Sequence, residues 1–276
     1  IERHEVRGRA FNLFHHGGYL LWRFQPDTTR LPFIDVHQAG TPRLRHLYVY
    51  ALQDPRAWRE LDQQYRFDWA VLPRYLPARP NLLDFLDADS AWALAFADDG
   101  GALYLRRGGA AAAQAQEYAM RRLRAGDGSE GGMLRAAALD TVARRELRAE
   151  LARTIAGSPW NSRARSVAAR LDEAAGDWRA AAAHLESAIG QRSTEPRLRE
   201  RLGIARLRSG DPAAALAAFE AERRTDTRWP DYHLRRAQAL QGMGRRDDAL
   251  AGYRRALAVD ATAGEARDSL ASLGVR

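Results

Sequence analysis

A repeat of 34 residues in the last part of the chain constrains its fold more than any other feature. Glycine recurs at this interval, at Gly176, Gly210 and Gly244. Each glycine is preceded seven positions earlier by a small residue and followed by an alanine and a bulky apolar residue, five and nine positions later. Small residues let paired helices approach closely, and a bulky residue fills the space beside the next pair. The spacing therefore predicts stacked helix pairs.

The best-matched unit of this repeat carries Leu202-Gly203, Gly210-Asp211, Ala215 and Phe219. On these residues, positions 162–276 resemble the tetratricopeptide repeat (TPR) family. The resemblance implies an all-α solenoid of three repeats plus a capping helix, because the terminal faces of such an array must be covered. The implied repeats are 162–195, 196–229 and 230–263, with the cap at 264–276. Where the family ends a repeat with proline, this chain has Thr227 and Ala261.

The first 108 residues show a different pattern, in which short β-like runs alternate with helical segments. Asp54 and Pro55 predict a helix over 55–65, since aspartate is a good N-cap and proline fits the first turn. A shorter helix is expected over 82–86, and Asp98–Gly101 predicts a hairpin turn. The expected strands are Ala10–Phe14, Pro32–Val36, Trp69–Leu72, Trp92–Ala97 and Ala102–Arg106.

Strands separated by helices favour a small α/β sandwich domain over residues 1–108. Residues 109–161 are rich in alanine and arginine and predict a helical connector. The helical array over 162–276 completes the chain. The overall fold class is therefore expected to be α+β.

Four short segments of the first domain carry a second resemblance, which spans residues 7–107. They are Phe11-Asn12, Gly17–Arg23, Phe33–Asp35 and Asp68–Pro73. They are similar to the soluble C-terminal domain of bacterial GT-C (dolichyl-phosphate-mannose type) glycosyltransferase-like membrane proteins. Where that family commonly has Asp-Gly-Arg, this chain has Asp35-Val36-His37. The resemblance implies a membrane-spanning region before Ile1 and a periplasmic position on the extracytoplasmic face of the inner membrane.

The charge of the chain and the absence of lysine and cysteine exclude several kinds of chemistry. All 43 basic residues are arginine, and the formal net charge is +8. Without lysine there is no Schiff-base or P-loop lysine, and without cysteine there is no thiol nucleophile or cysteine zinc site. The excess is 17 Arg minus 14 acids, or +3, over 1–125, and 26 minus 21, or +5, over 126–276. Because the arginines form no basic arm, we expect no nucleic-acid partner.

Two histidines and an aspartate–histidine pair fall at the expected ends of the first two strands. His15 and His16 follow the first strand, and Asp35 and His37 end the second. If these strands are parallel neighbours, the four side chains meet where open α/β sheets bind ligands. Imidazoles with a carboxylate suit Zn²⁺ binding or acid–base chemistry. The alternative is that Asp35 caps a turn and the histidines are loop residues.

In the TPR family the first helix of each repeat lines the concave face, which implies a peptide-binding groove here. Four arginines on that face favour an acidic or C-terminal-carboxylate peptide, since guanidinium binds carboxylate bidentately. Ile204 and Leu234 favour binding over the alternative, an ordinary solvated surface. The implied groove residues are Arg163, Ser166, Arg170, Arg197, Glu200, Ile204, Arg208, Asp231, Leu234 and Gln238.

The chain contains no glycine-rich nucleotide loop, nucleophile elbow or zinc-binding helix motif. We therefore expect no cofactor and no catalysis by this chain. The expected function is a protein–protein interaction or scaffold module that supports a glycosyltransferase-like membrane region and binds a protein or peptide. The alternatives are a metal-binding, hydrolytic or transferase-accessory domain centred on Asp35 and His37, and a self-association module.

Overall fold

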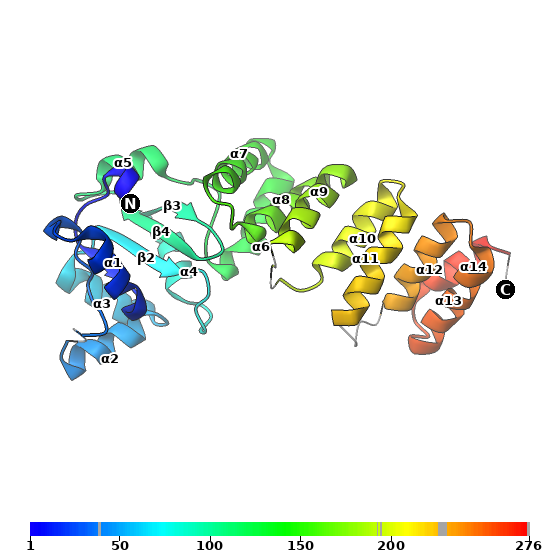
Figure 1. The fold of residues 1–276 in the computed structure, drawn as a ribbon, viewed down its shortest axis with the longest axis horizontal. Coiled ribbons are helices and arrows are strands. Elements are labelled where there is room, and N and C mark those ends of the chain that lie inside the picture. The colour runs from blue at the N-terminus through cyan, green and yellow to red at the C-terminus, as the bar shows by residue number, and fades with distance from the viewer. Residues whose placement is uncertain (38–39, 192, 194, 226–230, 275–276) are drawn as a thin grey trace. The chain divides into compact units, whose positions relative to one another are not determined.

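The computed structural model describes residues 1–37, 40–191, 193, 195–225 and 231–274. The chain divides into two compact units, residues 1–161 and 162–276. The chain is mostly helical with a small mixed sheet in the first unit, so its class is α+β as expected (Figure 1). Among the described residues, no helix combines the length and the apolar character needed to cross a bilayer.

The sheet of the first unit has the strand order β1-β2-β4-β3. β1 and β2 are parallel, whereas β4 is antiparallel to both of its neighbours. The predicted hairpin between the last two strands is confirmed, with Asp98 Oδ1 accepting the backbone N–H groups of Gly100 and Gly101 at 2.9 and 3.0 Å. The strands are β1 (Ala10–Asn12), β2 (Trp69–Pro73), β3 (Trp92–Ala97) and β4 (Gly101–Arg106).

Helices pack on both faces of this sheet. Leu20 of α1 and Ala115 of α5 join one apolar cluster with Leu105 of β4. The preceding residue, Tyr104, points to the opposite face, because side chains alternate along a strand. There its hydroxyl donates to Asp87 Oδ1 of α4 at 2.8 Å and lies 3.2 Å from Leu83 O of the same helix. The helices of this unit are α1 (Gly17–Phe24), α2 (Pro42–Ala51), α3 (Pro55–Tyr65), α4 (Leu82–Ala88), α5 (Ala112–Tyr118), α6 (Glu130–Leu139) and α7 (Thr141–Gly157).

The predicted strand Pro32–Val36 is wrong, because this segment is irregular. Proline lacks the N–H that a strand would donate. The side chain of Asn12 makes the missing contacts instead: its Nδ2 donates to Ile34 O and its Oδ1 accepts from Phe33 N, both at 2.8 Å. One side-chain amide thus holds the segment against the end of β1.

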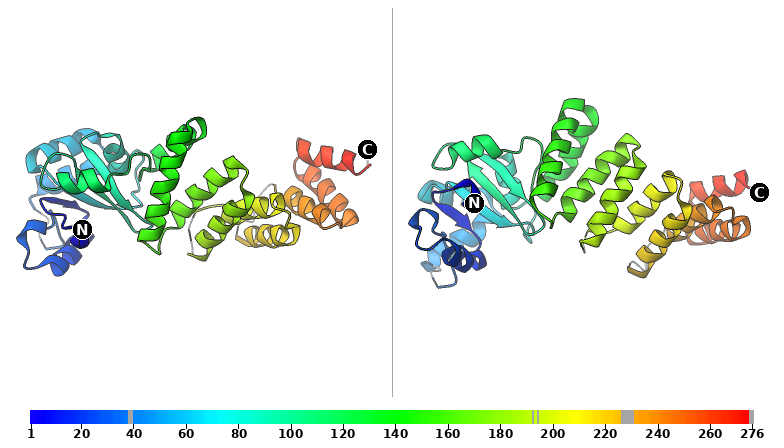
Figure 2. Two further views of the ribbon diagram at one scale, coloured as in Figure 1. Left: turned by 90° about the horizontal axis from the view of Figure 1, so that it is seen from above. Right: turned by 45° about the horizontal axis from the view of Figure 1, so that its top comes forward.

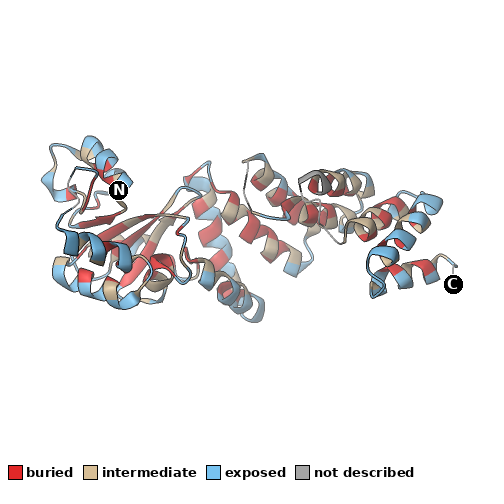
Figure 3. Cartoon of the chain, turned by 90° about the horizontal axis from the view of Figure 1, so that it is seen from below, coloured by how far each residue is buried: buried red, intermediate tan, exposed pale blue. Residues whose placement is uncertain are grey.

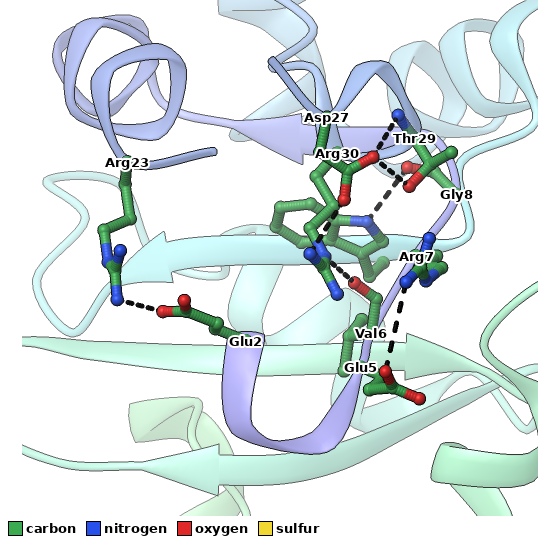
Figure 4. A network of polar contacts seen from close by, with 10 residues as sticks. Glu2, Glu5, Val6, Arg7, Gly8, Arg23, Asp27, Thr29 and Arg30 are labelled. Carbon is green, nitrogen blue, oxygen red and sulfur yellow. Dashed lines mark hydrogen bonds and ion pairs between the residues drawn. The ribbon is translucent and has the colours of Figure 1, made fainter. Parts of the chain in front are cut away.

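A polar network fixes the segment that leads into β1 (Figure 4). Arg30 is buried, and its Nε donates to Val6 O while its Nη1 pairs with Asp27 Oδ2, both at 2.8 Å. Arg23 of α1 forms an ion pair with Glu2. The two bonds of Arg30 satisfy its buried guanidinium, which would otherwise carry a large desolvation cost.

The segment 109–161 is helical, as expected, and its contacts belong to the first unit. The carboxylate of Glu150 on α7 is buried and accepts the backbone N–H groups of Arg121, Arg122 and Leu123 at 2.6, 3.0 and 2.7 Å. Backbone donors in a loop need such partners. Glu150 therefore fastens the loop after α5 to α7.

The second unit consists of antiparallel helix pairs that follow one another (Figure 2). Gly176, Gly210 and Gly244 lie in the turn between the two helices of successive pairs, with φ of 75°, 88° and 75°. Glycine adopts this left-handed region without the steric cost that a Cβ imposes. The helices are α8 (Ser162–Ala175), α9 (Trp178–Gly190), α10 (Leu198–Arg208), α11 (Pro212–Thr225), α12 (Tyr232–Gly242), α13 (Arg246–Val259) and α14 (Gly264–Ser272).

The repeated small and bulky positions meet inside this unit, where buried residues line the facing sides of the helices (Figure 3). A Cβ added to Gly203 on α10 would collide with the ring of Phe219 on α11. Tyr253 of α13 packs in the same cluster as Ala237 of α12. The expected repeat boundary at 229/230, the departure at Thr227 and the end of the cap at 275–276 lie outside the described residues.

Candidate functional site

A groove of about 720 Å³ lies in the second unit. Its walls come mainly from α10, α12 and α14, which occupy equivalent places in the succession of helices. Its lining residues are Ile204, Leu207, Arg208, Arg235, Gln238, Gln241, Gly242, Tyr253, Glu265 and Ser269. A hollow of this size, with a few polar groups over apolar side chains, has the general character of a binding site.

The apolar part of the groove comes from α10. Ile204 and Leu207 are half-buried and pack against a cluster that contains Phe219 and Ala239. Their inner sides therefore belong to the core, while their remaining surface faces the groove. An apolar ligand side chain placed there would gain about 25 cal/mol per Å² of apolar area removed from water.

The polar wall opposite is held by bonds between α12 and α14. Arg235 Nη1 donates to Gln238 Oε1 at 3.1 Å and to Glu265 Oε2 at 3.2 Å. Gln238 Nε2 donates to the same Glu265 oxygen at 3.1 Å. Because each side chain is fixed by two others, the wall presents its polar atoms in a defined arrangement.

A tyrosine orients a second amide in the groove. Tyr253 donates from its hydroxyl to Gln241 Oε1 at 2.5 Å. Burial raises the pKa of Tyr253, which keeps the hydroxyl protonated at neutral pH. With its oxygen engaged, the amide of Gln241 retains its two N–H groups as donors toward the groove.

Arg208 supplies positive charge at the groove. Its guanidinium lies over the ring of Trp178, 5.9 Å from the ring centre. Among the residues that the structure describes, it has no carboxylate partner. Its charge therefore remains available to an anionic group of a ligand.

The groove contains three of the ten predicted residues: Ile204, Arg208 and Gln238. Leu234 does not line this groove: it is 6% exposed and packs in the core with Ala237, Leu240 and Tyr253. Its apolar character reflects packing between helices and not a ligand.

Two other predicted groove residues are also buried, namely Ser166 and Glu200. Arg201 donates to Ser166 Oγ at 2.7 Å and to Glu173 Oε1 at 3.1 Å, so this arginine ties α10 to α8. Burial raises the pKa of Glu200, and the nearby positive charge of Arg197 opposes this. Ser166 thus serves a contact between helices, and Glu200 pairs with Arg197 at the start of its own helix. Asp231 is the N-cap residue of α12.

The four predicted arginines do not form one carboxylate-binding set. Arg170 pairs with Glu195 at 3.0 Å, and Arg197 pairs with Glu200 at 2.9 Å. Arg163 also has a partner within the protein. A sequence pattern places arginines on a face but does not show which acids reach them in the folded chain. Only Arg208 of the four lines the groove.

Several groove residues were missed, among them Arg235, Glu265 and Ser269. The 34-residue period could have found Glu265, because on α14 it repeats the position of Asp231, which the prediction included. The prediction did not extend the 34-residue period into the expected capping helix, which is α14.

The histidines and Asp35 of the first unit form a different arrangement from the one expected. Gly17 lies directly against Ile34 and Asp35, where a Cβ would clash, so the two segments do meet. Asp35 is buried, and its Oδ1 accepts the N–H of His37 at 2.6 Å, which closes a turn. The expected parallel strand that would align these side chains is absent.

The two adjacent histidines also differ in their surroundings. His15 is exposed, whereas His16 is half-buried and its Nδ1 has no hydrogen-bond partner. Burial, and then the neighbouring His15, lower the pKa of His16, so its ring is neutral near pH 7. Within the described ranges, no group of three or more His, Cys, Asp or Glu side chains is placed to hold a metal ion. The geometry therefore gives the metal-site hypothesis no support.

Comparison with known proteins gives no assignment. No family model matches the chain. No curated protein matches it at a significant level either. The function must therefore be argued from the geometry.

Proposed function

We propose that the second unit is a peptide-binding module whose groove between α10, α12 and α14 takes an extended segment of a partner protein. The observation that carries the proposal is the groove itself, with an apolar strip on one side and fixed amide and guanidinium groups on the other. The same pattern serves peptide recognition in general, where apolar pockets anchor side chains and polar groups hold the backbone.

The lining residues indicate the kind of segment. An apolar side chain fits against Ile204 and Leu207, and the amides of Gln238 and Gln241 suit the N–H and C=O groups of an extended backbone. An acidic group on the segment would pair with Arg208. The proposed ligand thus combines an apolar anchor with one acidic group, whereas the four arginines on the predicted face favoured an acidic or C-terminal-carboxylate peptide.

We also propose that residues 162–276 form a tetratricopeptide solenoid of three repeats with a cap. Support comes from the 34-residue period, from positive φ at Gly176, Gly210 and Gly244, and from the contact of Gly203 with Phe219. In such an array the first helices of successive repeats line one face, which agrees with the origin of the groove walls.

The test of peptide binding uses the whole chain and a phage-displayed random-peptide library. Selected peptides should share an apolar residue close to an acidic one. Synthetic versions should bind Arg208→Glu about tenfold or more weakly than the unmodified chain, because a charge-assisted contact is replaced by repulsion. Gln238→Ala should weaken binding less.

The matched control is Arg179→Glu, an identical charge change at an exposed site on α9 outside the groove. It should bind the selected peptides like the unmodified chain, and thermal unfolding should show that all variants are folded. Peptides that bind the Arg208 and Arg179 variants equally well would contradict the assignment of the groove.

We propose further that this unit belongs to the extracytoplasmic tail of a glycosyltransferase-like membrane protein, where it docks a protein partner. The support is the resemblance of residues 7–107 to such tails. Hydropathy of the coding sequence upstream of Ile1 tests this: several apolar stretches of about 20 residues are expected. A polar upstream sequence would contradict it.

A further inference from the structure

The first unit has a separate hollow of about 980 Å³ between α5 and α7. Its lining includes three alanines, Ala112, Ala113 and Ala119. It also includes three exposed arginines from separate segments: Arg107 after β4, Arg121 after α5 and Arg153 on α7. The hollow lies outside the peptide groove and has no part in the proposed function.

These three arginines form no ion pairs among the described residues. Across the part of the chain that the structure describes, none of them has a carboxylate partner. Arg153 Nη2 donates to Tyr118 O at 3.1 Å, which orients its guanidinium without balancing its charge. Most other arginines with ordered contacts in this unit face a carboxylate, as Arg30 faces Asp27 and Arg106 faces Asp62.

The two acids that line the hollow are already engaged. Both oxygens of Glu150 are taken up by the three backbone N–H groups of residues 121–123. Glu117 accepts a hydrogen bond from the hydroxyl of Tyr118. The guanidinium groups of Arg107 and Arg121 thus keep their N–H donors for a ligand, and the lining carries one positive charge in excess.

We propose that this hollow binds the phosphate group of a phosphate-bearing compound. A phosphate monoester carries about −1.5 to −2 charges and three acceptor oxygens. It therefore matches guanidinium groups that approach from three segments better than a planar carboxylate with one charge and two oxygens. The methyl groups of the three lining alanines suit an apolar part of the same compound.

The phosphate can belong to a soluble compound or to the headgroup of a phospholipid. Calorimetric titration of the whole chain with inorganic phosphate and with pyrophosphate tests the soluble source. Co-sedimentation with phosphatidylcholine vesicles, with and without phosphatidylglycerol, tests the headgroup. Citrate, a carboxylate of comparable charge, serves as the competing anion.

The variants are Arg107→Gln and Arg121→Gln, singly and together, since neither side chain makes a structural hydrogen bond in the described residues. Each single change should weaken binding about tenfold, and the double change about a hundredfold. The matched control is Arg145→Gln, which removes the same charge from an exposed site on α7 outside the hollow.

The site is supported if pyrophosphate or anionic vesicles bind the Arg145→Gln variant but not the double variant. The probe that binds then identifies whether the phosphate belongs to a soluble compound or to a phospholipid headgroup. No binding of any probe overturns the proposal. Equal losses in the control and the double variant also overturn it, because they indicate non-specific attraction to net positive charge. Citrate that binds as tightly as pyrophosphate overturns the choice of phosphate.

Discussion

At the scale of the residue, buried polar side chains close the first unit around its sheet. Asn12 uses its amide to hold the segment at Phe33 and Ile34, where a fifth strand was expected. Tyr48 accepts the N–H of Phe14 at 2.8 Å, and burial raises its pKa to about 12. Such groups are retained in a core only when they are hydrogen-bonded. They are structural, although their residue types also occur in active sites.

His16 gives a pH prediction at this scale. The pKa of His16 is lowered by burial and by His15. Below about pH 6.5, His16 is therefore protonated more readily in the unfolded chain than in the folded chain. The stability contributed by the neutral ring is complete above pH 6.5 and is lost as pH falls through the lower folded pKa. In urea unfolding between pH 7.5 and 5, His16→Gln should therefore lose less stability than the unmodified chain.

The control for this prediction is His37→Gln, which replaces an exposed ring in the neighbouring segment. Its unfolding free energy should follow that of the unmodified chain across the same range. If His16→Gln shows the same pH dependence as the unmodified chain, burial does not suppress protonation of His16.

At the scale of the element, the two helices of each pair approach each other closely at a small residue. Gly203 on α10 leaves the space that the ring of Phe219 on α11 fills, and both lie at positions repeated every 34 residues. The neighbouring pairs achieve the same approach with Ala169 and Ala237. The smallest residue of the three therefore faces the aromatic ring of Phe219.

Gly203→Ala should lower the free energy of unfolding by about 1–3 kcal/mol, because the added methyl group must displace a buried ring. Gly190→Ala is the matched control: this glycine ends α9 with open space around its Cβ position. There alanine should raise stability by about 0.4–1 kcal/mol, by restricting the unfolded chain. Urea unfolding measures both, and a neutral Gly203→Ala would contradict the packing argument.

At the scale of the whole molecule, the two units have separate cores. Aromatic and branched side chains build the first, whereas in the second buried alanines pack with leucines and with the single rings of Phe219 and Tyr253. Interactions in a repeat array run between neighbouring helices, so such an array is stable when its ends are covered. The capping contacts of α14, through Ala266 and Leu270, lie inside the second unit.

Residues 162–276 expressed alone should therefore be helical by circular dichroism, unfold cooperatively in urea and bind the selected peptides like the whole chain. The phosphate hollow belongs to residues 1–161, so the isolated second unit should not bind pyrophosphate. A fragment without cooperative unfolding would show that the array depends on contacts with the first unit.

Local signals account for the parts of the fold that could be predicted. Asp54 caps α3 as expected, with its Oδ1 accepting Arg56 N at 2.7 Å, and the helix spans the predicted residues. The hairpin turn at Asp98 and the glycine turns between helices are likewise decided by residues next to one another in sequence. The expected strand at Pro32–Val36 does not form. The side-chain amide of Asn12 bonds to the backbone of Phe33 and Ile34, where a neighbouring strand would otherwise have paired.

The sequence by itself determined the period of the second unit, its turns and the helical face on which Arg208 lies. Only the tertiary structure decided which arginines are paired with acids: Arg170 of α8 meets Glu195 from the segment before α10, whereas Arg197 pairs with Glu200 three residues along its own segment. The tertiary structure also buries Leu234 in the core and places Glu265 in the groove. Turns and caps depend on neighbouring residues, whereas burial and charge pairing depend on residues that meet only after the chain has folded.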